Sequence, residues 1–282
     1  MLKIAIPNKG ALSEETITLL REAGYRCRRS GRELMLYDAG NDIEFYFLRP
    51  RDIPVYVANA TLQLGITGRD LAVDAGVDFQ EILPLNFGHS KFCYAAPADL
   101  EISPDQFHGK RIATSYPTLV RNDLAQRNVD ASIIRLDGAV EISIQLGVAD
   151  IIADVVESGR TLKEAGLSVI GEPIFRSEAI LIGAAGFDAN MPEVSRFCDR
   201  IRGILLARTF AIVEYDCPRS ILEQACAITP GIEAPTIAPL RDENWMAVKS
   251  MVKRSDINQI IDQLSAIGAK GIIVTRIETC RI

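Results

Sequence analysis

Short apolar runs alternate with polar, helix-like stretches along the first ninety residues, and this alternation constrains the fold more than any other feature. The apolar runs span residues 2–7, 43–48 and 63–67, and helical patterns fall near residues 13–23 and 51–60. Alternation of this kind is typical of an α/β fold.

The same alternation continues in a second α/β unit as far as about residue 184. Its predicted strands are residues 91–97, 110–115, 131–136, 149–156 and 178–184. Helices are predicted near residues 118–128, 139–146 and 161–166, and a further helix rich in Arg and Leu covers about 190–208.

From about residue 209 the pattern changes to that of a smaller module. Strands are predicted at 209–215, 236–239, 245–251 and 271–277, and helices at 219–227 and 255–267. The order βαββαβ is that of a ferredoxin-like split-βαβ unit. Because this module carries no nucleophile or carboxylate pair of its own, we expect it to regulate or to oligomerise.

Composition excludes several classes of function. With 282 residues, 48% hydrophobic and 24% charged, the chain is typical of a globular protein of two or three domains. The net charge of −6 and the lack of a clustered basic stripe argue against nucleic-acid binding.

No apolar run reaches membrane length, and the first residues resemble a strand rather than a leader, so we expect a cytoplasmic protein without membrane contact. Six cysteines without a C-x-x-C pair are expected to be free thiols, and two histidines exclude a histidine-rich metal site.

One segment predicts a site for a phosphorylated sugar. The apolar run 149–156 contains Asp154 and passes directly into a Ser-Gly-Arg-Thr turn at residues 158–161. Glycine lets backbone N–H groups approach an anion closely, and the hydroxyls of Ser158 and Thr161 add donors. Asp154 is then expected to face ribose hydroxyls. The same Ser-Gly-x-Thr pattern also fits an ordinary helix cap, and this segment alone leaves both interpretations open.

Charged clusters follow other predicted strands, where open α/β sheets bind ligands. Lys9, Arg49 and Arg51 offer cations suited to phosphates, and Asp70 and Glu141 add carboxylates. Mg²⁺ can bridge such carboxylates and a pyrophosphate. Each cluster also has a purely structural interpretation, as solvated side chains or helix caps.

These motifs resemble those of one enzyme family in the same order. The run Glu141-x₅-Gly147-x-Ala149-x₂-Ile152-x-Asp154-Val155-x₂-Ser158-Gly159-x-Thr161-Leu162 resembles the signature of the ATP phosphoribosyltransferases. The segments PNKGAL, FLRPRDI, GITGRD, IATSYP and LDGAVEISIQLG agree with that family, and YDCPRS, PTIAPL and AIGAKGI resemble its long form. The resemblance covers essentially the whole chain.

The resemblance implies a fold and a reaction. The fold is a two-lobed catalytic unit like the type II periplasmic binding proteins, with lobe I at 1–90 and 184–208 and lobe II at 91–183. A ferredoxin-like, ACT-like regulatory domain follows at 209–282. The reaction is attack of adenine N1 of ATP on C1 of phosphoribosyl pyrophosphate, with loss of pyrophosphate and a requirement for Mg²⁺. This is the committed step of L-histidine biosynthesis, inhibited by histidine.

The resemblance also implies residue roles and an assembly. Phosphoribosyl pyrophosphate is assigned to Glu141, Asp154, Glu157, Ser158, Gly159, Arg160 and Thr161. ATP and phosphate contacts are assigned to Lys9, Arg49, Arg51, Asp70 and Tyr116, and Mg²⁺ to Glu141 and Asp154. The effector L-histidine is assigned to Asp216, Thr236, Ala269 and Gly271, in a homo-hexamer built from dimers.

Two other functions remain as alternatives. A two-lobed solute-binding or ligand-sensing protein shares the architecture, but a secreted one is expected to begin with a leader. A catalytically silent regulatory paralogue is expected to lose Asp154 or the Ser-Gly-x-Thr turn, and both are present.

Overall fold

The computed structural model describes residues 1–28, 31, 33–156 and 159–281. The chain divides into two compact units, an N-terminal unit of Met1–Arg21 and Tyr25–Val194 and a C-terminal unit of Glu22–Gly24 and Ser195–Ile282. Among the described residues, no helix has both the length and the apolar character needed to cross a membrane.

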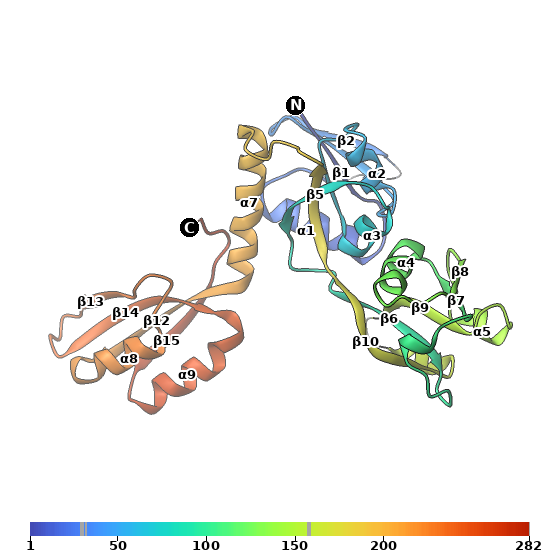
Figure 1. Cartoon of the computed structure of the whole chain (residues 1–282). Helices are drawn as coiled ribbons and strands as arrows, with labels where there is room; N and C mark the ends of the chain where they lie inside the picture. The colour runs from blue at the N-terminus through green and yellow to red at the C-terminus, as the bar shows by residue number, and fades with distance from the viewer. Residues whose placement is uncertain (29–30, 32, 157–158, 282) are drawn as a thin grey trace. The chain divides into compact units, whose positions relative to one another are not determined.

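Lobe I of the N-terminal unit is built on a sheet that, in the described part of the chain, has six strands in the order β2-β3-β1-β4-β11-β5 (Figure 1). β1 pairs in parallel with β3 and β4, whereas β11 is antiparallel to β4 and β5. The strands are β1 (Leu2–Pro7), β2 (Met35–Asp38), β3 (Ile43–Leu48), β4 (Leu64–Gly68), β5 (Phe79–Pro84) and β11 (Ala179–Ala184). The helices are α1 (Ala11–Glu22), α2 (Ile53–Ala58) and α3 (Arg69–Asp74).

Lobe I owes its core to apolar strands and one close backbone contact. Ile4, Ala5 and Ile6 of β1 are all fully buried, which explains why this strand is a continuous apolar run rather than an alternating one. At Gly65 of β4, a Cβ would lie 2.5 Å from Cγ2 of Ile53, so glycine is what lets α2 pack closely on the sheet.

Lobe II is built on a second sheet, whose five strands in the described chain run in the order β10-β6-β9-β7-β8. β7 is parallel to both β8 and β9. The strands are β6 (Ser90–Pro97), β7 (Arg111–Thr114), β8 (Ser132–Arg135), β9 (Ile151–Val156) and β10 (Leu167–Ser177). The helices are η1 (Pro104–Gln106), α4 (Pro117–Gln126), α5 (Ile142–Gln145) and α6 (Arg160–Glu164). Tyr94 and Phe107 meet edge to face in the core, with ring centroids 5.0 Å apart.

The chain passes from one lobe to the other after β5 and returns between β10 and β11 (Figure 1). This is the two-lobed architecture of type II periplasmic binding proteins, as expected. The predicted boundary of lobe II at 91–183 is wrong at its C-terminal end, because residues 179–184 pair with strands of lobe I. The pattern identified a strand at 178–184 but not the sheet that it joins.

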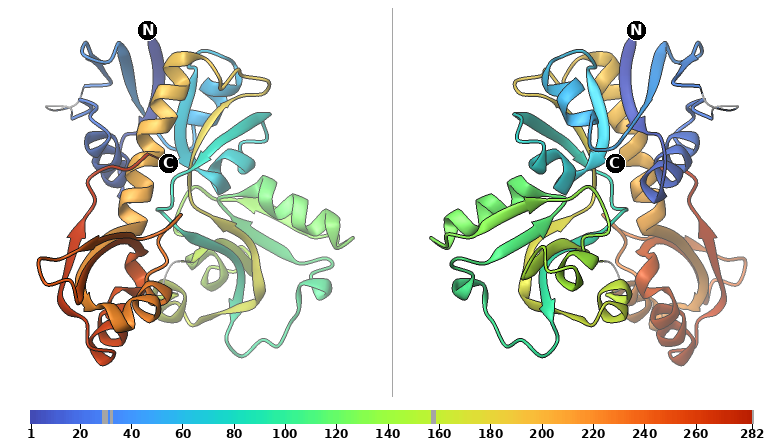
Figure 2. Two further views of the ribbon diagram at one scale, coloured as in Figure 1. Left: turned by 90° about the vertical axis from the view of Figure 1, so that its left-hand side faces the viewer. Right: turned by 90° about the vertical axis from the view of Figure 1, so that its right-hand side faces the viewer.

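The C-terminal unit has the predicted βαββαβ order. After α7 (Pro192–Thr209) come β12 (Phe210–Pro218), η2 (Arg219–Ile221), α8 (Leu222–Ile228), β13 (Thr236–Pro239), β14 (Trp245–Lys253), η3 (Arg254–Asp256), α9 (Ile257–Ala266) and β15 (Lys270–Arg276). The described strands form a sheet in the order β13-β14-β12-β15, with α8 and α9 packed on one face (Figure 2). Residues 195–209 of α7 group with this unit, rather than with lobe I as the range 184–208 implied.

Candidate functional site

Lobe I collects charged side chains at one edge of its sheet. Lys9, Arg49 and Asp70 follow β1, β3 and β4, and these strands are parallel neighbours, so the residues after their carboxyl ends lie at the same edge. Arg51 is held near that edge by a turn, because the hydroxyl of Thr67 donates to the carbonyl of Pro50 at 2.7 Å. Lys9 and Arg49 are exposed, whereas Asp70 is buried. The arrangement leaves two cations available at the surface.

Lobe II collects its own polar residues at the carboxyl ends of three strands. β9, β7 and β8 lie side by side and are parallel. Asp154 lies near the end of β9, Tyr116 follows β7, and Glu141 lies in the segment after β8. The position matches the edge at which open α/β sheets bind ligands.

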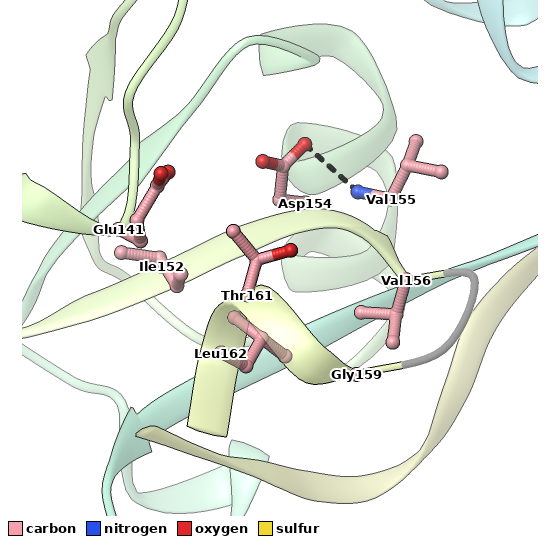
Figure 3. Close-up of a pocket in the computed structure, with 8 residues that line it drawn as sticks. All are labelled: Glu141, Ile152, Asp154, Val155, Val156, Gly159, Thr161 and Leu162. Carbon is pink, nitrogen blue, oxygen red and sulfur yellow. Dashed lines mark hydrogen bonds between the residues drawn. The ribbon is translucent and has the colours of Figure 1, made fainter. Parts of the chain in front are cut away.

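A cavity of about 220 Å³ opens at the end of β9 (Figure 3). The side chains of Glu141, Asp154 and Thr161 project toward the same side of this strand. Gly159 occupies the N-cap position of α6 with φ +70°, a left-handed conformation that favours glycine. The described residues that line the cavity are Glu141, Ile152, Asp154, Val155, Val156, Gly159, Thr161 and Leu162.

Asp154 is the electrostatic centre of the cavity. Burial raises its pKa above the ordinary aspartate value, and the nearby charge of Glu141 raises it further. Two groups oppose this rise: the backbone N–H of Val155, which donates to Oδ1 at 2.8 Å, and the charge of Arg51. The folded protein therefore holds an under-solvated carboxylate that gains from any positive charge placed beside it.

Other predicted phosphate ligands lie outside this cavity or outside the described chain. The side chain of Arg160 is 84% exposed and pairs with Glu164 at 2.8 Å, so it is not among the described lining residues. Glu157 and Ser158 lie outside the described residues. Of the residues in the predicted Ser-Gly-Arg-Thr turn, Gly159 and Thr161 lie in the cavity wall.

Arg51, Tyr116 and Asp70 come together where the lobes of the N-terminal unit meet. The guanidinium carbon of Arg51 lies 4.7 Å from the ring centroid of Tyr116, a cation–π contact. Burial and then the charge of Asp70 raise the pKa of the Tyr116 hydroxyl, which stays protonated at neutral pH. Asp70 in turn accepts a hydrogen bond from the hydroxyl of Ser177 at 2.8 Å.

Sequence reasoning missed Asp74 and Ser177. Asp74 accepts a hydrogen bond from Nη1 of Arg51 at 2.8 Å. One signal was available for it, since Asp70 and Asp74 are four residues apart on a helix and so share a face. No such local signal points to Ser177, which lies 107 positions from its partner Asp70.

The four predicted effector residues are only partly brought together within one chain. Asp216 of β12 lies beside Gly271, where a Cβ would be 3.6 Å from its Oδ2. Thr236 lies on β13, which β14 separates from β12, although Thr236 and Asp216 share the face of the sheet away from the helices. Ala269 packs into the core under those helices.

Comparison with known families defines the class of protein. The family model described as ATP phosphoribosyltransferase matches residues 49–203, and the model described as HisG, C-terminal domain matches residues 207–279. The chain is thus a pentosyltransferase with a two-lobed catalytic unit and an additional C-terminal domain.

Individual relatives agree over the full length. The ATP phosphoribosyltransferase of Salinibacter ruber is 54% identical to this chain, and that of Mycobacterium tuberculosis is 52% identical, each alignment covering 100% of both proteins. A chain of the ATP phosphoribosyl transferase (HisG:HisZ) complex from Thermotoga maritima superimposes with a TM-score of 0.62 at 28% identity, covering 72% of this chain and 97% of that chain. The chain belongs to the ATP phosphoribosyltransferase family.

Proposed function

We propose that the cavity around Asp154 is where this chain carries out the reaction of its family. In that reaction adenine N1 of ATP attacks C1 of phosphoribosyl pyrophosphate, pyrophosphate leaves, and phosphoribosyl-ATP begins the pathway to histidine. The observation that carries the assignment is the convergence of Glu141, Asp154 and Thr161 on one cavity beside the left-handed turn at Gly159. Carboxylates can accept hydrogen bonds from ribose hydroxyls, and the threonine hydroxyl and the backbone N–H groups after the glycine can donate to a 5-phosphate.

The reaction makes a modest demand on acid–base chemistry. Adenine N1 is unprotonated at neutral pH and is already a nucleophile, so no strong base is required. His89 and His108 are not among the described residues that line the cavity, and Nδ1 of His108 accepts the backbone N–H of Asp130 at 3.2 Å. Positioning and electrostatics must therefore supply the rate acceleration.

In this mechanism Asp154 acts on the sugar. As pyrophosphate departs, positive charge develops at C1 and on the ring oxygen of the ribose. A carboxylate that burial leaves poorly solvated interacts more strongly with this transition state than with the neutral sugar, which is the condition for catalysis. The 5-phosphate is held by the hydroxyl of Thr161 and by backbone N–H groups after Gly159.

The cations of lobe I bind the remaining phosphates. Lys9 and Arg49 are exposed at the sheet edge, and Arg51 is half-exposed. These three side chains would hold the triphosphate of ATP and the pyrophosphate leaving group, while Asp70 and Tyr116 contact the nucleotide. Guanidinium groups suit this role because they bind phosphate oxygens in pairs.

The donor set fits a Mg²⁺ ion that is shared with substrate. Among the described residues, no three His, Cys, Asp or Glu side chains cluster as a complete metal site. Glu141 and Asp154 nevertheless line one cavity and repel each other, and Mg²⁺ commonly takes one or two carboxylates together with substrate phosphates and water. Bound there, Mg²⁺ supplies charge neutralisation for the pyrophosphate.

We further propose that the C-terminal unit binds L-histidine and that the chain works as a homo-hexamer built from dimers. In this proposal Asp216 would pair with the amino group or imidazole of the effector near Gly271, and Thr236 lies on the same face of the sheet, away from the helices. Because Thr236 and Asp216 are separated by β14, a neighbouring module is suited to complete the pocket. ATP and phosphoribosyl pyrophosphate are cytoplasmic metabolites, so we place the reaction in the cytoplasm.

A direct assay tests the assignment. The purified chain is mixed with ATP, phosphoribosyl pyrophosphate and Mg²⁺, and phosphoribosyl-ATP is followed by its absorbance. The parent should turn over, and Asp154→Asn should fold but lose most activity. Binding of both substrates without turnover by the parent would instead indicate a sensing protein or a silent paralogue.

A further inference from the structure

Asp74 is a buried carboxylate with three hydrogen-bond donors. Its side chain is 4% exposed, at the last residue of α3. Oδ2 accepts from Nη1 of Arg51 at 2.8 Å, and Oδ1 accepts from the backbone N–H groups of Thr118 at 2.8 Å and Leu119 at 3.3 Å. An unpaired buried charge costs several kcal/mol, so the three donors are what allow a carboxylate here.

The three donors belong to different lobes. Arg51 follows β3 in lobe I, whereas Thr118 and Leu119 lie in the first turn of α4 in lobe II. Tyr116, at the N-cap position of α4, makes no side-chain capping bond. The carboxylate of Asp74 therefore takes the place of an N-cap and puts negative charge at the positive end of the helix.

Asp74 also fixes the direction of Arg51. The guanidinium is held at Nη1 by Asp74, and its central carbon lies over the Tyr116 ring, 4.7 Å from the centroid. No hydrogen bond joins Nε or Nη2 to any described residue. Arg51 is also near enough to Asp154 for its charge to act on that carboxylate across the lobes. The side chain is thus orientated before any ligand binds, and its Nε and Nη2 groups can donate to that ligand.

We propose that Asp74 is a positioning residue for phosphoribosyl transfer. It sets the direction of the Arg51 guanidinium and holds the start of α4, and with it Tyr116, against lobe I. A substrate phosphate then meets an arginine that has already lost its rotational freedom, which lowers the entropic cost of binding in the reactive geometry. This inference rests on the proposed function, in which Arg51 binds a substrate phosphate.

A double-mutant cycle tests the inference in the full-length chain. Asp74→Asn keeps an oxygen for the N–H groups of Thr118 and Leu119 but removes the negative charge that orientates Arg51. We expect Asp74→Asn and Arg51→Gln each to lower kcat/KM by about 10- to 100-fold, the scale for a misplaced contact, and the double variant to lose little more than the worse single one. If Asp74→Asn prevents folding, Asp74→Ser provides the same test because serine is a good N-cap.

Asp123→Asn is the matched control. Asp123 is also a largely buried carboxylate, which accepts from the hydroxyl of Tyr94 and from Nε of Arg127, both at 2.9 Å. This variant should lower the melting temperature and leave kcat/KM unchanged.

The double-mutant cycle distinguishes failure of the inference about Asp74 from failure of the proposed function. Losses that multiply in the double variant mean that Asp74 acts independently of Arg51, and the inference is then wrong. The inference is equally wrong if Arg51→Gln is fully active, a result that also removes Arg51 from the proposed phosphate site. Absence of turnover in the parent would contradict the proposed function itself.

Discussion

Ser177 and Asp70 exchange two hydrogen bonds: the hydroxyl of Ser177 donates to the Asp70 carboxylate at 2.8 Å and accepts the backbone N–H of Asp70 at 3.0 Å. Both residues are buried. Ser177 is the last residue of β10, at the point where the chain returns from lobe II to lobe I. A proposed nucleotide contact is therefore tied directly to the crossover between the lobes.

Removing this hydroxyl should destabilise the N-terminal unit. Ser177→Ala leaves a buried carboxylate oxygen and a buried N–H without their partner, which costs about 1–3 kcal/mol of unfolding free energy. The KM for ATP should also rise, because Asp70 loses its support. Urea denaturation and initial rates measure the two effects. Ser255→Ala removes an exposed hydroxyl that bonds to Asp256 and should change stability by less than about 0.5 kcal/mol.

Asp154→Asn should separate activity from stability. The electrostatic contribution of a carboxylate beside the reacting carbon suggests a loss of about 10²–10³ in kcat. Stability at pH 7 should rise, because the variant no longer carries a charge that burial leaves poorly solvated. Rates and melting temperatures of parent and variant measure both. A stability loss at pH 7 with normal turnover would show that the carboxylate is structural.

The pH dependence of that stability difference has a definite sign. Burial raises the pKa of Asp154 above its ordinary value of 3.8, so the folded chain binds this proton more tightly than the unfolded chain does. Between the ordinary and the raised pKa, the free energy of unfolding of the parent falls as pH rises. At higher pH, the difference in stability between the parent and Asp154→Asn no longer changes with pH. The advantage of Asp154→Asn should therefore shrink as pH is lowered toward 3.8. Asp137→Asn, which removes a carboxylate from a side chain that is 86% exposed, provides the comparison variant.

Thr161→Ala should weaken binding of phosphoribosyl pyrophosphate by about 1–3 kcal/mol, the scale for a lost hydrogen bond to a charged group. The fold should be unaffected, because Thr161 is exposed in the first turn of a short helix. Isothermal titration measures the affinity. Thr18→Ala removes a hydroxyl whose partner among the described residues is the carbonyl of Glu14, and this variant should bind as the parent does. Equal affinity of the two variants would contradict the assignment of the cavity to the 5-phosphate.

Asp216→Ala should abolish inhibition by L-histidine while the uninhibited rate stays at the parental level. Glu214→Ala provides the control, since Glu214 lies on the same face of the sheet and pairs with Lys249 at 3.1 Å. Rates across a histidine titration distinguish the variants. Undiminished inhibition of Asp216→Ala would remove this carboxylate from the effector site.

Local patterns predicted most of the elements but not all of their partners. The strands 2–7, 43–48 and 236–239 match the predicted ranges, because each is a short run bounded by turns. β10 was missed, since Gly171 with φ +64° and a register shift between Ile170 and Phe175 interrupt its pattern. A shift of this kind depends on the pairing with β6, which the local sequence does not encode.

In the candidate site too, local sequence predicts some of the contacts but not those between distant residues. Asp154, Gly159 and Thr161 lie within eight consecutive residues of the sequence, at the end of β9 and the start of α6, so their proximity follows from local sequence. Asp74 receives hydrogen bonds from residues 23, 44 and 45 positions away, and only the packing of two lobes brings these donors together. Arg160 has the residue type expected of a phosphate ligand, but it pairs with Glu164 at i+4 and is not among the described residues that line the cavity.

The return of β11 to lobe I has a consequence for the order in which the protein is made. A nascent chain that has emerged only as far as residue 178 contains every described strand of the lobe II sheet. Lobe I at that moment lacks the strand that lies between β4 and β5, so its sheet is divided into two parts. Of the two lobes, the one whose synthesis begins first is thus completed second, after the whole of the other lobe has been synthesised.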